Sequence, residues 1–476
     1  MFSSLKGLIK ILNSVLLLAA LAVSLYMNDS TYILIVLLPI VILDRSFLIP
    51  LLFTIPVVEG VYATDTTSSN SETIAIAMLV PILAYDLVKR NKQMVPFKVT
   101  ALYIIFVIMA FVGFIVYKRH PEISKAISIP MHASYVPVLG KVLAKILKIT
   151  FFWVYVKLLI NYGKDYIYEA LKLFRALSPY IILVIAGYTL VFGQVSQKFG
   201  GVIHFGSASH GDFTASLDAL CVFLYLALFE RSNRYFEKFM AIAAIGALLY
   251  LIMQMGSRNG LLSFGFVTVL GVFLVMRNRS WTFQFILVAG AFIVGVTALY
   301  FFQDSPTIQR FIFEMTEEGG GERVDYWYAG GRAVKDAPVL GQGGDETASL
   351  YSVGKYSPNV EDHVMHNTFL EIAVEYGLLG LTFYLIFVYT IIRWGYKQVL
   401  YAINTNDLIL GTPAIAYTVS IMAGMFISRV WDTTLWYYLG IIFAIGILWL
   451  EPMKKKNKYF ARRGRSKLTP QLSATV

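Results

Sequence analysis

The sequence predicts an all-α polytopic membrane protein with about fourteen transmembrane helices and one long extracytoplasmic loop. The 476-residue chain is 57% hydrophobic and only 14% charged, whereas about 25% of residues are charged in a soluble globular protein. The apolar residues fall in blocks close to the roughly 20 residues that a helix needs to cross a bilayer. A single long polar segment, 302–366, interrupts this pattern.

The apolar blocks give the order of the predicted spans. We expect them at 8–27, 31–43, 47–63, 72–88, 98–117, 142–160, 179–195, 213–230, 237–254, 259–276, 281–301, 367–393, 411–427 and 433–450. The second and third are short and flank Asp44-Arg45, so a broken pair and a total of twelve spans stay open. No small-residue cleavage site follows the first block, which favours a retained span over a signal peptide. The single cysteine, Cys221, excludes an intrachain disulfide.

Charge asymmetry predicts the orientation. With the N-terminus inside, nearly all cytoplasmic segments are rich in Lys or Arg, as the positive-inside rule requires. The tail after Leu450 has eight Lys or Arg against one Glu, whereas 302–366 has five against eleven Asp or Glu. The net charge of +11 therefore indicates contact with membrane lipid rather than nucleic acid. The segment Lys118–Lys141 breaks the rule and is interpreted as interfacial or re-entrant. The basic segment 162–177 predicts an amphipathic helix on the cytoplasmic face.

Four parts follow from this organisation, and no internal repeat is visible. They are an N-terminal bundle of about eleven spans (1–301), an extracytoplasmic catalytic or capping loop (302–366), C-terminal transmembrane helices (367–450) and a basic cytoplasmic tail (451–476). A loop as long as 302–366 is usually functional or disordered. Its aromatic residues favour a packed cap over disorder.

Arg258 is the first residue with an indicated chemical role. It lies between Gly256 and Gly260 at the outer end of a predicted span. A guanidinium matches two phosphate oxygens, and a helix N-terminus adds partial positive charge. The pattern therefore indicates a phosphate site, with an arginine that reaches toward the outer interface as the competing interpretation.

The acidic loop holds Arg310, Arg323 and Arg332. For any one of them, a surface salt bridge with Glu314, Glu317, Glu322 or Asp336 is favoured over a role in ligand binding. Arg323 is the best candidate because it precedes Tyr326-Trp327-Tyr328. Aromatic rings together with arginine suit a saccharide–phosphate ligand, by stacking and by charge.

Two histidines, His363 and His366, stand just before the predicted span 367–393. Imidazole titrates near neutral pH and is a good general base for a hydroxyl nucleophile. Glu371 and Glu375 follow with a spacing of four, so they share one helix face. In an apolar helix we expect them to pair with arginine or to line a cavity.

Nucleotide and metal sites are not supported. The glycine-rich segment Leu340–Gly344 lacks the Lys-Ser/Thr ending of a phosphate-binding nucleotide loop. His204, His210 and Asp212 could hold a metal or form a ligand-facing loop, and the sequence leaves both open.

Taken together, these segments resemble the O-antigen ligase and O-antigen polymerase superfamily of bacterial integral-membrane glycosyltransferases. About a quarter of the chain, within a family-like core at 239–393, carries the resemblance. The matching residues are, in order, Gly256-Ser257-Arg258-Asn259-Gly260, Arg323-x-x-x-Trp327, Asp336-x-Pro338-x-Leu340-Gly341-x-Gly343 and His366-Asn367-x-Phe369-Leu370-Glu371-x-x-x-Glu375-x-Gly377-Leu378-Leu379-Gly380.

The resemblance implies a GT-C-like fold and an inverting transfer, without metal or other cofactor, on the outer face of the bacterial inner membrane. The donor would be an undecaprenyl-diphosphate-linked glycan and the acceptor a hydroxyl. Arg258 and Arg323 would hold the diphosphate, and His366 would activate or orient the acceptor. Lys198 stands where family members commonly have arginine and would act as a point charge on phosphate. Further substrate contacts would come from Arg310, Arg332, His363, Trp327 and Glu371.

Several functions stay open within this interpretation. The span count and moderate loop favour a polymerase of O-antigen or exopolysaccharide repeat units, with a chain-length regulator as a further partner. A ligase that transfers glycan to lipid A core is the alternative. A flippase for lipid-linked oligosaccharide would handle the same ligand, but it should show inverted repeats and charges near mid-membrane. A non-catalytic partner in polysaccharide export is the remaining alternative.

Overall fold

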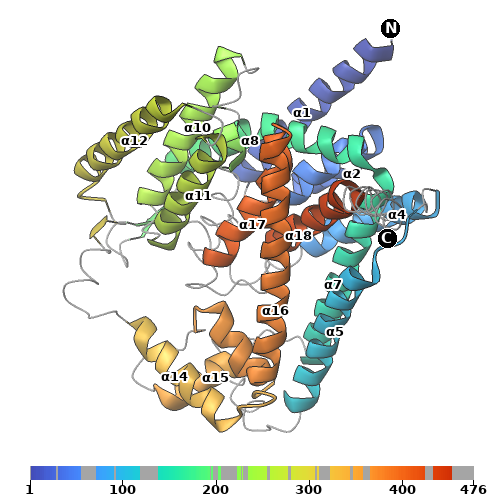
Figure 1. Ribbon diagram of the computed structural model, residues 1–476, viewed down its shortest axis with the longest axis vertical. Helices are drawn as coiled ribbons and strands as arrows, with labels where there is room; N and C mark the ends of the chain where they lie inside the picture. The colour runs from blue at the N-terminus through green and yellow to red at the C-terminus, as the bar shows by residue number, and fades with distance from the viewer. Residues whose placement is uncertain are drawn as a thin grey trace, which may run out of the picture.

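The computed structural model is a bundle of apolar helices with a small helical cap at one end of its longest helix (Figure 1). It describes residues 2–27, 31–54, 71–89, 93–117, 138–192, 194–196, 202–204, 222–226, 228, 234–254, 258–276, 280–305, 308–309, 322–343, 347–357, 365–423 and 433–452.

The helices follow the apolar blocks of the sequence. The N-terminal half contains α1 (Phe2–Met27), α2 (Thr31–Leu43), η1 (Arg45–Phe47), α4 (Ser71–Lys89), α5 (Phe97–Tyr117), α7 (Val138–Tyr162) and α8 (Lys164–Phe192). The C-terminal half contains α10 (Tyr235–Gln254), α11 (Arg258–Met276), α12 (Trp281–Phe301), α14 (Glu322–Asp336), α15 (Thr347–Tyr356), α16 (Thr368–Asn404), η3 (Leu408–Gly411), α17 (Thr412–Ala423), α18 (Thr433–Ile445) and η4 (Gly446–Leu450).

The predicted helical membrane class is confirmed, although the count of fourteen spans stays a prediction. Among the described residues, five helices are long and apolar enough to cross a membrane: Leu5–Met27, Phe97–Val116, Lys164–Tyr188, Tyr235–Gln254 and Thr368–Asn404. The β-structure of the described residues is one antiparallel pair, β1 (Gln194–Ser196) and β2 (Val202–His204), with Val195 opposite Ile203. No strand was predicted there from the sequence.

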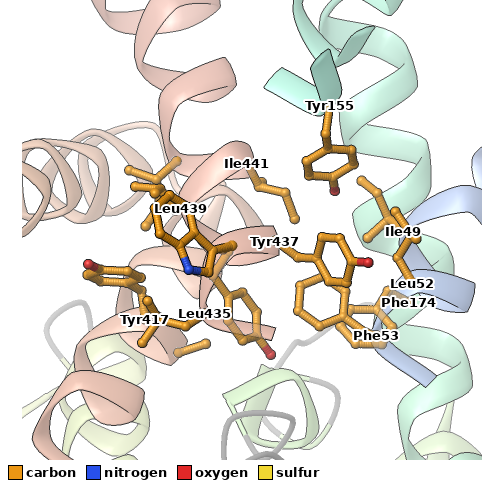
Figure 2. Close-up of a cluster of buried hydrophobic side chains, with 14 of the residues drawn as sticks. Ile49, Leu52, Phe53, Tyr155, Phe174, Tyr417, Leu435, Tyr437, Leu439 and Ile441 are labelled. Carbon is orange, nitrogen blue, oxygen red and sulfur yellow. The ribbon is translucent and has the colours of Figure 1, made fainter. Parts of the chain in front are cut away.

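Helix α18 lies at the centre of the bundle. Trp436, Tyr437 and Tyr438 follow one another on it and all are buried, as expected for a helix that is apolar around its whole circumference. Trp436 stacks on Phe152 of α7, with ring centroids 5.2 Å apart. Figure 2 shows Tyr437 beside Phe53 within this cluster, and their ring centroids lie 5.7 Å apart. The aromatic residues of α18 thus join α7 to the short helical segment after η1.

Helix α8 corrects one prediction. The surface helix at 162–177 and the span at 179–195 were expected as separate elements, but they form one continuous helix that contains Pro179. Proline cannot donate to the carbonyl four residues earlier, here that of Arg175. The hydroxyl of Ser178 donates to this carbonyl at 3.0 Å. The freed acceptor is therefore satisfied, and the helix continues through the proline.

A buried ion pair connects the ends of several N-terminal helices. The Arg45 guanidinium donates to the Asp86 carboxylate at 2.7 Å, and the Asp86 side chain is only 4% exposed. The Tyr162 hydroxyl donates to the same carboxylate oxygen at 2.5 Å. Charged side chains at such positions persist in membrane proteins when they are paired. The Asp44-Arg45 break between the second and third blocks thus has a structural role.

Helix α16 is longer than predicted and is broken. The expected span ended at residue 393, whereas the helix continues to Asn404. Gly377 interrupts it with φ 68° and ψ −173°, a conformation that is essentially restricted to glycine. Residues 368–376 therefore form a separate short helix that leads from the cap into the bundle.

The polar segment 302–366 contains two helices that were not predicted. Figure 1 shows α14 and α15 together at the end of α16 where that helix begins. They have a small core of their own, which includes Tyr326, Ala329, Ala333, Val353 and Met365. We call α14, α15 and the residues that lead into α16 the cap. Its aromatic and alanine residues bury enough surface to pack on α16 despite the acidic composition of the segment.

Candidate functional site

His366 lies at the junction of the cap and α16, and its backbone is held on both sides. The N–H of Met365 donates to the hydroxyl of Ser349 on α15 at 3.1 Å. On the other side, the Asn367 carboxamide caps α16 by accepting from the N–H groups of Phe369 and Leu370 at 3.1 and 3.0 Å. The imidazole is therefore carried by a segment that is fixed at each end.

The backbone of His366 is strained. Its φ is 47°, in the left-handed region. At the other left-handed positions of the described residues the chain has Asn406 or a glycine. Glycine adopts this conformation freely, and asparagine and histidine adopt it more often than other side chains do. A histidine there costs about 1–3 kcal/mol, and such strain clusters at functional sites. The outlier is thus an independent observation in favour of a role for His366.

Helix α14 packs against this junction. The Tyr326 and His366 rings meet edge-on, with centroids 6.1 Å apart and planes at 65°. A Cβ on Gly330 would lie 2.5 Å from Leu370 and 2.6 Å from Met365. The glycine thus lets α14 approach the residues on either side of His366. From the sequence, Tyr326 was named within the aromatic run after Arg323 but without a separate role, and no role was predicted for Gly330.

Two predicted residues lie on one flank of α14, about one turn apart. Arg323 is half-buried in the first turn and Trp327 is half-buried four residues later. The indole nitrogen of Trp327 is buried, and no described residue accepts its hydrogen bond. Indole N–H groups usually find a partner when they are buried. A ligand atom or an ordered water is therefore the expected acceptor.

Arg332 occupies a different face of α14. Its side chain is exposed, and its guanidinium donates twice to the Tyr328 hydroxyl, at 3.0 and 2.6 Å. The salt bridge considered for it with Asp336 does not form, because Asp336 pairs with Lys355 at 3.3 Å. Arg332 is therefore not placed with Arg323 and Trp327, and its contact with substrate stays a prediction.

The glycine-rich motif and the break in α16 form one backbone clamp. The N–H groups of Gln342 and Gly343 donate to the carbonyls of Val374 and Glu375 at 2.7 and 2.8 Å, and that of Leu378 donates to Pro338 at 2.8 Å. These bonds satisfy backbone groups that the break would leave without helical partners. Glu371 and Glu375, both buried, lie on the short helix that this clamp holds.

The side chain of Gln342 extends the clamp to the cap. Its amide nitrogen donates to the Ala333 carbonyl of α14 at 3.5 Å, and its oxygen accepts from Ser352 of α15 at 2.9 Å. The motif that sequence analysis excluded as a nucleotide loop thus ties both cap helices to α16.

Arg258 comes from another part of the bundle. It is the first residue of α11, and the structure describes its backbone only. The next residue, Asn259, is 4% exposed. Neither polar atom of its carboxamide has a hydrogen-bond partner among the described residues. Asn259 belongs to the Gly256–Gly260 motif, but no role was predicted for it from the sequence.

Three predicted residues, Lys198, Arg310 and His363, lie outside the described residues. Their roles stay predictions, as does the expectation that no metal takes part.

The fold and this junction define a class: an integral membrane protein whose polar cap holds a strained histidine, an arginine and a tryptophan beside a broken span. A comparison with known protein families matches part of the chain. Residues 243–385 match the family model for O-antigen ligase. The match lies inside the predicted core and extends from α10 to the first half of α16. No curated protein matches the chain.

The predicted resemblance to the O-antigen ligase and polymerase superfamily is thereby confirmed. The chain carries a region of the O-antigen ligase/polymerase type of membrane glycosyltransferase. This region includes Arg258, Arg323, Trp327 and His366, whereas Lys198 lies outside it.

Proposed function

We propose that this protein transfers a glycan from undecaprenyl diphosphate to an acceptor hydroxyl, and that it polymerises O-antigen or exopolysaccharide repeat units. The observation that carries the proposal is the left-handed backbone of His366, next to α14 and within the O-antigen ligase match. The second candidate is ligation of the glycan to lipid A core, which the description of the matched family favours.

The reaction follows from the residue types. His366 takes the proton of the acceptor hydroxyl as its oxygen attacks the anomeric carbon. The new carbon–oxygen bond forms as the bond to the diphosphate breaks, and attack from the opposite face inverts the anomeric centre. Arg258 and Arg323 stabilise the departing diphosphate, which carries away the electron pair. Glu371 orients the acceptor, and Trp327 stacks on a sugar and donates its indole N–H.

The active site faces the periplasm in this proposal, and both termini lie in the cytoplasm of a bacterial inner membrane. The acidic balance of 302–366 and the basic tail support this orientation. A lipid-linked donor also suits a cap beside the start of a long apolar helix, where polar and apolar surroundings meet.

The test is reconstitution of the purified protein with undecaprenyl-diphosphate-linked oligosaccharide, followed by sizing of the glycan. Long chains are expected if the protein is a polymerase. Product that forms only after lipid A core is added would identify a ligase and overturn the polymerase assignment. Movement of the donor across a vesicle bilayer without turnover would identify a transporter and overturn the transferase.

Variants test the proposed residues. Arg258→Ala, Arg323→Ala and His366→Ala should each lower turnover by at least about a hundredfold, as expected for general-base and charge-stabilising groups. Lys335→Ala removes an exposed cation from the last turn of α14 and should retain wild-type turnover.

His366→Gly separates function from strain. Glycine accepts a φ of 47° without cost, so this variant should unfold at the wild-type temperature or above it and yet lose turnover. Wild-type turnover in His366→Gly would remove the imidazole from the mechanism.

A further inference from the structure

Asn259 carries a buried carboxamide without a described partner, in the first turn of a long apolar helix. It is 4% exposed, and neither its amide nitrogen nor its oxygen forms a hydrogen bond with any described residue. A buried amide that loses its water without a replacement partner is costly. Each such group in a native structure therefore needs an explanation, such as a ligand or a bound water.

The surroundings of Asn259 indicate that its side chain faces the protein interior, where a ligand could bind, and not the lipid. Helix α11 packs against α10 and α17, and the 4% exposure places Asn259 in the interior of the bundle. Polar side chains within membrane helices usually face the protein interior or a water-filled path. Asn259 also directly follows Arg258, to which the proposed function gives the diphosphate.

The chemistry of the carboxamide restricts what it binds. It offers donors on nitrogen and an acceptor on oxygen, and both are unused among the described residues. A diphosphate can only accept, so it would leave the carboxamide oxygen unsatisfied. A sugar hydroxyl or an acetamido group both donates and accepts, and can satisfy the two atoms together.

We propose that Asn259 binds the donor sugar next to the diphosphate, through a hydroxyl or acetamido group of that sugar. This inference rests on the proposed function, because it takes Arg258 as the diphosphate ligand. Arg258 then binds the diphosphate that all donors share, and Asn259 recognises the first sugar. A site built to hydrogen-bond a substrate group discriminates against analogues that lack it.

The test compares two ligands, undecaprenyl diphosphate alone and the same lipid linked to the oligosaccharide, in detergent-solubilised full-length protein. Asn259→Leu, close in size but apolar, should weaken binding of the glycan-linked lipid about tenfold and leave binding of bare undecaprenyl diphosphate unchanged. Arg258→Ala should weaken both ligands. The KM for the donor should rise in Asn259→Leu, while the KM for the acceptor stays constant.

A stability measurement separates this role from a structural one. Asn259→Leu removes an amide without a described partner, so its thermal unfolding temperature should equal or exceed that of the wild type. The matched control is Asn13→Leu. Asn13 is also buried, but its amide nitrogen donates to the Ile40 carbonyl at 3.4 Å. This control should unfold at a lower temperature and keep the wild-type ratio of the two affinities.

Each contrary result has its own meaning. Equal weakening of both ligands by Asn259→Leu, unchanged binding of both, or a lower unfolding temperature would overturn the role of Asn259 and leave the transferase intact. A rise in the acceptor KM alone would overturn the assignment to the donor sugar. Failure of the wild-type protein to bind or turn over either lipid would overturn the proposed function itself.

Discussion

Gly341 and Gly377 touch backbone to backbone, and neither position has room for a side chain. A Cβ on Gly341 would lie 2.5 Å from the backbone nitrogen of Gly377, and one on Gly377 would lie 2.2 Å from the carbonyl oxygen of Val339. Both glycines also have left-handed backbones, with φ 71° and 68°. This contact allows the hydrogen bonds that hold the loop after α14 against the break in α16.

Replacement of Gly377 should therefore be among the most damaging single substitutions at the contact between the cap and α16. We expect Gly377→Ala to lower the free energy of unfolding by about 3 kcal/mol or more, because backbone strain and overlap with Val339 act together. Thermal unfolding in detergent measures this. Gly163→Ala is the control, since Gly163 has φ 89° but no atom within 4 Å of its Cβ position. It should cost only about 1–2 kcal/mol. Equal losses would mean that the close approach contributes nothing.

Gly330 and Gly331 provide a matched pair on α14. A Cβ on Gly330 would overlap Met365 and Leu370, whereas one on Gly331 has no atom within 4 Å. Gly330→Ala should push α14 away from the residues around His366, at a cost of about 1–3 kcal/mol, and lower transfer activity. Gly331→Ala should stabilise the protein by about 0.5–1 kcal/mol through helix propensity. The unfolding temperature and the turnover of the two variants test these expectations. Loss of activity in both variants would mean that a more rigid α14, and not its distance from His366, lowers the activity.

Much of the membrane bundle follows from the sequence because long apolar blocks have few alternatives. Insertion of an apolar block into a bilayer depends mainly on its length and composition. The helices α5 and α10 therefore lie close to their predicted bounds, and α1 ends at its predicted residue. The sequence predicted two separate elements, 162–177 and 179–195, that meet at Pro179. The structure continues through it because Ser178 supplies the missing donor, a local hydrogen bond that apolar periodicity does not reveal.

The cap was harder to predict, for a physical reason. The core of α14 and α15 uses Ala329, Ala333 and Tyr326, residues that give a weak apolar pattern in an acidic segment. The glycines at 341 and 377 lie far apart in the sequence, so their contact cannot be read from spacing. His366 was predicted from its chemistry, whereas its strained backbone is visible only in the structure.

Asp407, in the turn between α16 and η3, should make the stability of the folded protein depend on pH. Burial raises the pKa of its carboxyl above the ordinary value, although a hydrogen bond from Tyr168 and the charge of Lys172 oppose the shift. The folded protein thus holds this proton to higher pH than the unfolded chain does. The associated stability is present at low pH and is lost as pH rises through the folded pKa.

The variant Asp407→Asn should not lose stability as the pH rises, because its side chain cannot ionise. At neutral pH the variant should unfold at a higher temperature than the wild type, and the difference should disappear below about pH 4, where both states are protonated. Unfolding temperatures across this pH range provide the measurement. A variant that is less stable than the wild type at neutral pH would mean that the carboxylate contributes more through Tyr168 and Lys172 than burial costs it.

The Arg45–Asp86 pair should be more costly to break than to replace. Asp86 is almost fully buried and accepts from both Arg45 and Tyr162, so Arg45→Met leaves a buried carboxylate with one donor from a hydroxyl. We expect a loss of about 3 kcal/mol in the free energy of unfolding.

The double variant Arg45→Met/Asp86→Leu removes both charges and should recover most of this loss, because an apolar pair of similar size has no charge to desolvate. The double-mutant cycle in thermal unfolding measures the coupling directly. If the double variant lost as much stability as the two single variants combined, the two side chains would act independently, and the ion pair would contribute no coupling energy.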